Sequence, residues 1–324
     1  MNPARLSLLC ISVLIAACGS GSDRLGNRPS TTTFAITPAN AATATRVAWE
    51  AALASADFGN VGSGMVISTS SPGDFSKPGL ATSLAGKLIN PVQMDPLGPV
   101  VRSCFVRGIV TTTGDVADVT LATLSTGDTF RDVYEFCDDG FGEVIDGTVD
   151  VAVREFTGDL DTGLYMLSLD VVLTDLQVAT GTDTVVSNGD TTVTLDSMQS
   201  PFLRAGASGT SMTVDSNASS ETLSDFTTSQ TIDAGVQTLP FTLAAAGTLD
   251  STQLAGVVRY STPVTFAGEG FDFPSSGTFL VMGENSSARL TAVDNINVMI
   301  EIDGNGDGVV DATINTTWAA LAAS

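Results

Sequence analysis

The 324-residue sequence contains no histidine and only two lysines, Lys77 and Lys87. Without histidine, Ser-His-Asp and Cys-His catalytic systems are excluded, as are zinc, copper or iron sites built on imidazole ligands. Neither lysine lies in a GxxxxGK phosphate-binding loop, and the sequence has no GxSxG motif and no GxGxxG motif after an expected strand. These absences remove most of the common enzyme classes.

Basic and aromatic residues are also scarce. The chain has 13 Lys and Arg against 36 Asp and Glu, which gives a formal net charge of −23. Such a charge repels the phosphate backbone, so we exclude nucleic acid as a partner. Aromatic residues make up 6% of the chain, and 32 glycines with 43% hydrophobic residues indicate a folded chain with many turns and a core of small aliphatic side chains.

The N-terminal residues have the pattern of an export signal. Arg5 is followed by an apolar run from Leu6 to Leu14, and Ile15-Ala16-Ala17-Cys18 leads into a Gly- and Ser-rich stretch. This pattern resembles the signal of bacterial lipoproteins, in which the cysteine thiol receives a diacylglyceryl group, the chain is cleaved before it, and the new amino terminus is acylated. The resemblance implies a mature chain that starts at Cys18 and is anchored by acyl chains in the bacterial envelope, with the outer membrane favoured by Gly19.

The remaining cysteines indicate one disulfide. Cys10 lies in the signal and Cys18 takes the lipid, which leaves Cys104 and Cys137. Two leftover cysteines in an exported chain are expected to pair, although two free thiols are the alternative.

The sequence divides into a signal, a tether and a β-rich domain. Residues 1–17 form the signal, 18–36 a flexible tether and 37–324 the domain, with a weak boundary at 206–236. The domain begins with a helix that has Thr37 as N-cap and ends near Gly59, and one helix face, Val47, Ala48, Ala51 and Ala54, is expected to pack on a sheet. Prolines in 68–99 predict an irregular connection or short edge strands.

From Val100 onward the pattern is that of strands. Apolar and polar residues alternate at Val149, Val151 and Val153 and again over 165–171, and turn signals such as Asp146-Gly147 and Asn188-Gly189-Asp190 recur. We therefore predict a mainly β fold, an antiparallel meander forming a curved sheet, sandwich or incomplete barrel, with one N-terminal helix.

One stretch has a chemical signature. Two alternating segments, 296–302 and 310–318, enclose Asp303-Gly304-Asn305-Gly306-Asp307-Gly308. The stretch resembles the DxNxDGxxD calcium loops of EF-hand, dockerin and thrombospondin-type-3 proteins. The resemblance implies Ca²⁺ ligands at Asp303, Asn305, Asp307, the carbonyl of Val309, and Asp311. Ile314 stands where an EF-hand has its bidentate Glu, and the flanks are strands. The alternative is an acidic turn in which these residues only supply turn geometry.

The sequence therefore predicts a lipid-anchored envelope or cell-surface protein, a non-enzymatic structural or ligand-binding module without catalytic residues, which calcium would stabilise if the loop binds it. Its predicted membrane contact is through Cys18. The sequence does not identify which protein, glycan or lipid it binds. One alternative is an amphiphile-carrying lipoprotein with an open β-barrel and a helical lid. A second is a glycan-active enzyme using carboxylates among Glu135, Glu143 and Glu155.

Overall fold

The computed structural model describes residues 33–60, 99–117, 124–138, 140, 142–159, 163–270 and 272–324. The expected signal, the predicted lipidation site Cys18 and most of the proline-rich connection at 68–99 lie outside these residues. No helix in the described ranges is long and apolar enough to span a bilayer.

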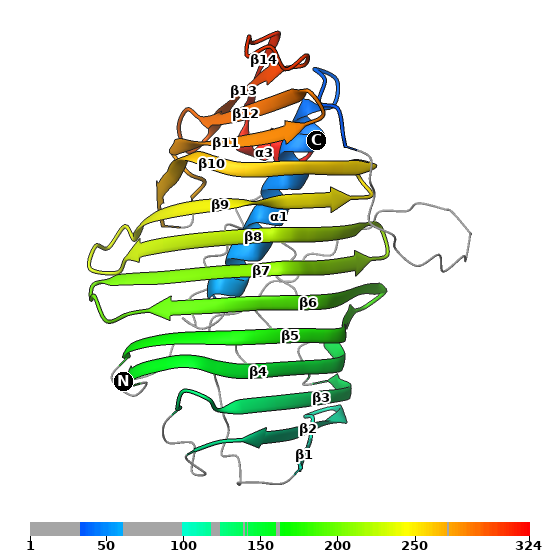
Figure 1. The fold of residues 1–324 in the computed structure, drawn as a ribbon, viewed down its shortest axis with the longest axis vertical. Helices are drawn as coiled ribbons and strands as arrows, with labels where there is room; N and C mark the ends of the chain where they lie inside the picture. The colour runs from blue at the N-terminus through cyan, green and yellow to red at the C-terminus, as the bar shows by residue number, and fades with distance from the viewer. Residues whose placement is uncertain are drawn as a thin grey trace.

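The described chain forms one antiparallel meander in which each strand pairs with its neighbours in sequence (Figure 1). The prediction of a mainly β fold with an N-terminal helix is confirmed, and the sheet is open, with β1 and β14 at its two edges. The elements are α1 (Ala41–Asn60), β1 (Val100–Ser103), β2 (Arg107–Asp115), β3 (Thr129–Asp138), β4 (Glu143–Asp159), β5 (Leu164–Thr180), β6 (Asp183–Asp196), β7 (Phe202–Ser216), β8 (Ser220–Asp233), β9 (Pro240–Ser251), β10 (Gly256–Glu269), β11 (Ser276–Gly283), β12 (Ser286–Ala292), β13 (Asn297–Asp303), β14 (Ala312–Thr317) and α3 (Trp318–Ala322). The region 206–236 holds β7 and β8, in the middle of this sheet.

Alternation places the strand side chains as expected. Val149, Val151 and Val153 are all buried in β4, and Leu167, Leu169 and Val171 are buried in β5. Because successive side chains of a strand point to opposite faces, these valines and leucines form an apolar inner face while their polar neighbours point outward.

Two of the expected turns are wrong. Gly147 and Gly189 lie inside β4 and β6, beside breaks in the pairing register, with φ of 117° and 138°. A Cβ on Gly189 would lie 2.3 Å from the carbonyl oxygen of Ser211, so only glycine fits there. Asp175 and Asp225 also have positive φ next to register breaks, in β5 and β8. These bulges on neighbouring strands bend the sheet.

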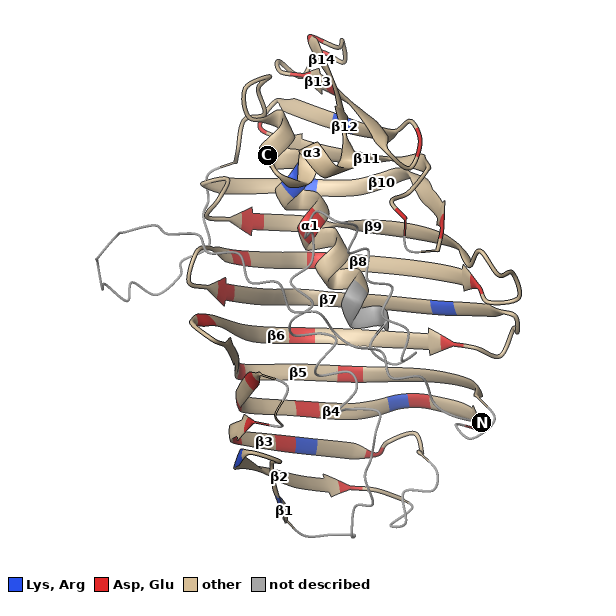
Figure 2. Ribbon diagram, turned by 180° about the vertical axis from the view of Figure 1, so that it is seen from behind, with Lys and Arg blue, Asp and Glu red and all other residues tan. Residues whose placement is uncertain are grey.

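Helix α1 lies across one face of the sheet (Figure 2). It contacts β6 to β9 and β11 to β13, and it is buried on nearly every side. Val47, Ala48 and Ala51 are buried as predicted, but Ala54 is exposed, so its assignment to the packing face is wrong. The solvent-facing stripe is Arg46, Glu50 and Ala54, at i, i+4 spacing.

An aromatic cluster fills the space beneath α1. The Trp49 ring lies 4.7 Å from Phe266, 5.3 Å from Phe279 and 5.5 Å from Trp318. Trp318 begins α3, where Thr317 caps the helix by accepting from the amide of Ala320, so the strand expected to run through Trp318 ends one residue earlier. The chain after β14 therefore folds back onto α1.

Candidate functional site: the acidic loop between β13 and β14

The predicted calcium loop joins two paired strands at the end of the sheet. Ile302 at the end of β13 pairs with Ala312 at the start of β14. Val298, Ile300 and Ile302 are at most 1% exposed, so the base of the loop is anchored in the core.

The loop backbone curls around the carboxylate of Asp303. The Asp303 Oδ1 accepts hydrogen bonds from the amides of Asn305 (3.3 Å) and Gly306 (2.7 Å), and Oδ2 accepts from the amide of Gly308 (2.9 Å). These backbone N–H groups, that of Gly308 foremost, lower the pKa of Asp303. Gly306 and Gly308 have φ of 73° and 83°, which explains the glycine at both positions.

The other predicted side-chain ligands accept hydrogen bonds within the same loop. The amide of Gly304 donates to Asp311 Oδ2 at 2.8 Å, and that of Asp307 donates to Asn305 Oδ1 at 2.9 Å. Asp307 accepts from the amide of Val309 at 2.8 Å and from Asn305 Nδ2 at 3.1 Å. Each of the four predicted side-chain ligands thus accepts at least one N–H hydrogen bond within the loop.

The donor set fits calcium by its chemistry. Asp303, Asp307 and Asp311 provide three carboxylates, and Asn305 and the Val309 carbonyl provide neutral oxygens, which are the ligands a hard cation prefers. Within the described ranges, no three His, Cys, Asp or Glu residues converge as a group that could hold a metal ion. The carboxylates of the loop therefore have to turn from their amide partners toward a common point before they bind an ion together.

Two distant segments pack against this loop. A Cβ on Gly306 would lie 2.9 Å from the Asn285 carbonyl oxygen, in the turn between β11 and β12. The same turn holds the start of the described chain: the Glu284 amide donates to the Phe34 carbonyl at 2.9 Å, and the Ile36 amide donates to Ser286 Oγ at 2.8 Å. Residues 33–36, expected to belong to the tether, are thus fixed beside the loop. Sequence reasoning missed this contact because no local pattern marks it.

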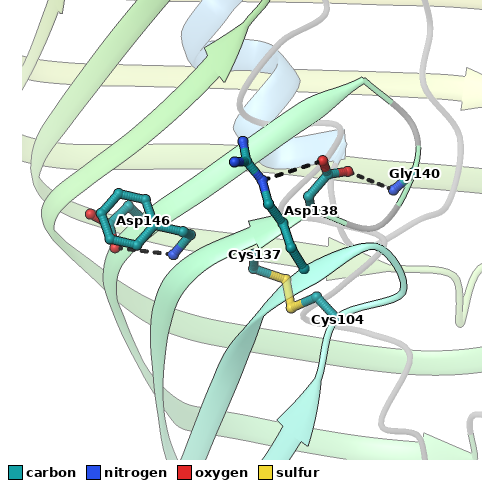
Figure 3. Close-up of a disulfide and its surroundings, with 7 residues drawn as sticks. Cys104, Cys137, Asp138, Gly140 and Asp146 are labelled. Carbon is teal, nitrogen blue, oxygen red and sulfur yellow. Dashed lines mark hydrogen bonds and ion pairs between the residues drawn. A yellow bond between two sulfur atoms is a disulfide. The ribbon is translucent and has the colours of Figure 1, made fainter.

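The predicted disulfide is present (Figure 3). Cys104 and Cys137 have Cα atoms 5.4 Å apart and link the β1–β2 turn to β3. Beside them Arg107 forms an ion pair with Asp138 at 3.7 Å, and Asp138 accepts from the amide of Gly140 at 2.9 Å. The bond fastens the first edge of the sheet.

The three glutamates considered for glycan chemistry are not brought together. Glu143 begins β4, whereas Glu155 lies 12 residues further along the same strand, about 40 Å away at 3.3 Å per residue. Glu135 lies in β3 at the Glu143 end, paired with Ile109. Glu155 is therefore remote from the other two.

Sequence reasoning also missed a polar chain at the rim of α1. Arg46 Nη1 donates to both carboxylate oxygens of Glu50, at 3.0 and 2.8 Å. Arg46 Nη2 contacts Gln253 at 3.4 Å, and Gln253 donates to Glu221 at 2.8 Å. Burial raises the pKa of both Glu50 and Glu221, with Arg46 opposing the shift. Only the Arg46–Glu50 pair had a sequence signal, its i, i+4 spacing.

A shallow groove of about 460 Å³ crosses β4 to β8. Two of its acidic side chains form cross-strand hydrogen bonds: Asp170 accepts from Arg154 at 3.0 Å and from Thr192 at 2.7 Å, and Asp190 accepts from Thr210 at 2.9 Å. These bonds tie neighbouring strands together where the sheet bends.

Comparison with known proteins found no matching family model, no matching curated protein and no matching solved structure.

Proposed function

We propose that this chain is a lipid-anchored, non-enzymatic module of the bacterial envelope whose C-terminal hairpin is stabilised by calcium. Two features support the proposal: the Ile15-Ala16-Ala17-Cys18 pattern and the oxygen-rich loop at Asp303–Asp311. The observation that carries it is the contact between this loop and residues 33–36, the segment that leads back toward Cys18. A cation in the loop would stabilise the point at which the anchor meets the domain.

Calcium would act here as a structural ion. Asp303, Asn305, Asp307, Asp311 and the carbonyl of Val309 would supply its oxygens, and the ion would compensate the repulsion among three carboxylates. The loop would then hold its form against the β11–β12 turn. The protein's own contribution is the buried base of β13 and the two glycines that let the backbone curl.

Calcium titration by calorimetry, with thermal melts in calcium and in chelator, tests this proposal. We expect one saturable site and a higher melting temperature in calcium, because a ligand that binds only the folded state stabilises it by mass action. Asp303→Ala combined with Asp307→Ala should abolish both effects.

A matched control is Asp294→Ala in the β12–β13 turn. Like Asp303, Asp294 is partly exposed and has its pKa lowered by hydrogen bonds, those from Asn297 being the strongest. This variant should bind calcium as the unmodified chain does. Absence of binding heat and of any calcium-dependent melting shift in the unmodified chain would reduce the loop to a hydrogen-bonded turn.

The amphiphile-carrying alternative needs an apolar concavity large enough for acyl chains. Between α1 and strands β10 and β11 the space is occupied by Trp49, Phe266 and Phe279, each at most 1% exposed. This packing counts against a ligand cavity in that part of the molecule.

A further inference from the structure

The start of the described chain and the acidic loop lie at the same end of the sheet. Thr33 forms a bridge with Val257 in β10, and Phe34 and Ile36 are held by the β11–β12 turn. Gly304 and Gly306 of the loop approach Ile36 and Asn285. Figure 1 shows the blue start of the chain beside the red hairpin, far from β1.

The same loop exposes two apolar side chains. Val309 and Val310 are 63% and 48% exposed. They follow a run of Asp, Asn and Gly, so they are the apolar side chains of an otherwise polar loop. Adjacent exposed valines at the end nearest an expected lipid anchor are what a surface that touches a bilayer presents.

Chain length favours this end over the opposite edge. Fourteen residues, 19–32, separate Cys18 from Thr33, and the coil that their Gly- and Ser-rich composition predicts spans about 20 Å on average. Nine strand spacings separate β1 from β10, or about 43 Å. Contact of the β1 edge with the membrane would therefore need a nearly extended tether.

We propose that the surface formed by the loop Asp303–Asp311, the β11–β12 turn and residues 33–36 faces the lipid bilayer, with Val309 and Val310 in contact with its headgroup region. The inference rests on the proposed lipid anchor. Two partly exposed valines are too few to hold the domain on a membrane alone, but they suffice to orient a domain that is already tethered. The acidic loop repels anionic headgroups, so a divalent cation bound in the loop would favour this contact.

The test uses the full lipidated chain bound to vesicles of phosphatidylethanolamine and phosphatidylglycerol, in a buffer that contains calcium. Single cysteines replace three side chains of equal exposure: Val309 (63%), Ile296 (61%) and Val101 (59%). Ile296 immediately precedes β13, at the strand end opposite the loop, and Val101 lies in the first edge strand. Each cysteine carries a fluorophore, and lipids spin-labelled at the headgroup quench it.

We expect the strongest quenching at Val309→Cys, weaker quenching at Ile296→Cys and none at Val101→Cys. Adding Val310→Asp to the Val309→Cys protein should reduce its quenching. Equal quenching at all three positions, or the strongest at Val101→Cys, would overturn the proposed orientation while leaving the anchor intact. Protein that fails to float with the vesicles would instead refute the lipid anchor.

Discussion

The two ends of this sheet are stabilised in different ways. At the β14 end, Ala288, Leu290 and Ile300 are fully buried and pack toward α1 and the aromatic cluster. At the β1 end, Phe105 is 88% and Phe136 65% exposed, and the Cys104–Cys137 disulfide links the first strands. In the part of the chain that the structure describes, α1 packs against β6 to β9, whereas it makes few or no contacts with β1 to β5.

This difference shows how a long open sheet can keep both edges ordered. Where a helix covers the sheet, burial of aromatic and aliphatic side chains holds the strands together. At the β1 edge, where α1 does not reach, a covalent link that restricts the unfolded chain adds to the burial of side chains in β4 and β5. The following variants break one end at a time.

The largest effect is expected from Trp49→Ala. Trp49 is 1% exposed and contacts three aromatic rings, so its removal should lower the free energy of unfolding by about 5 kcal/mol, the upper end for a buried aromatic. Urea unfolding measures the loss. Ala54→Ser, on the exposed stripe of the same helix, should cost no more than about 0.5 kcal/mol. Equal losses in both variants would contradict the assigned packing face.

Replacing both cysteines, Cys104→Ser with Cys137→Ser, should have the next largest effect. The bond closes a loop across a sequence separation of 33, for which chain entropy gives about 4 kcal/mol. Native-state hydrogen exchange should show the loss in β2 and β3 while the amides of β11 to β13 stay protected. Uniform loss of protection across the sheet would mean that its two ends are not stabilised separately.

The smallest effect is a pH dependence at the α1 end. Burial, assisted by the nearby Glu50 carboxylate, raises the pKa of Glu221 above its ordinary 4.5. A raised carboxyl pKa contributes stability that is present below the ordinary value and lost as the pH rises through the folded-state value. Glu221→Gln keeps an acceptor for Gln253 but does not titrate. The melting temperature of this variant, relative to that of the unmodified chain, should therefore rise as the pH increases from 4.5 toward neutrality. A difference in melting temperature that does not change with pH would refute this role.

Local patterns in the sequence predicted the strands, the helix and the disulfide. Alternating valines in β4 depend on neighbours in sequence, and two leftover cysteines leave one pairing. The predicted N-cap at Thr37 is wrong, because α1 begins at Ala41 and the Thr37 amide instead donates to Asn40 Oδ1. The loop residues at Asp303–Asp311 were likewise found from their spacing, although their binding of calcium stays a prediction.

What the sequence missed depends on long-range packing. An Asp-Gly pair such as Asp146-Gly147 suits both a turn and a β-bulge, because both need a residue with positive φ. Only the pairing with the neighbouring strand distinguishes the two structures. Ala54 shares a helical face with Val47 by spacing, yet the sheet and α3 enclose the other sides of α1. The contact between Ile36 and Ser286 joins residues 250 positions apart, which no local pattern reports.

The strand order has a consequence for how the chain folds. Every strand pairs with its sequence neighbour, so the sheet can grow one hairpin at a time, with short loops to close at each step. Helix α1 is made first, yet its partners Phe266 and Phe279 lie more than 200 residues later. During synthesis, we therefore expect α1 to remain undocked until nearly the whole sheet has formed, and its docking to be the step that completes the native structure.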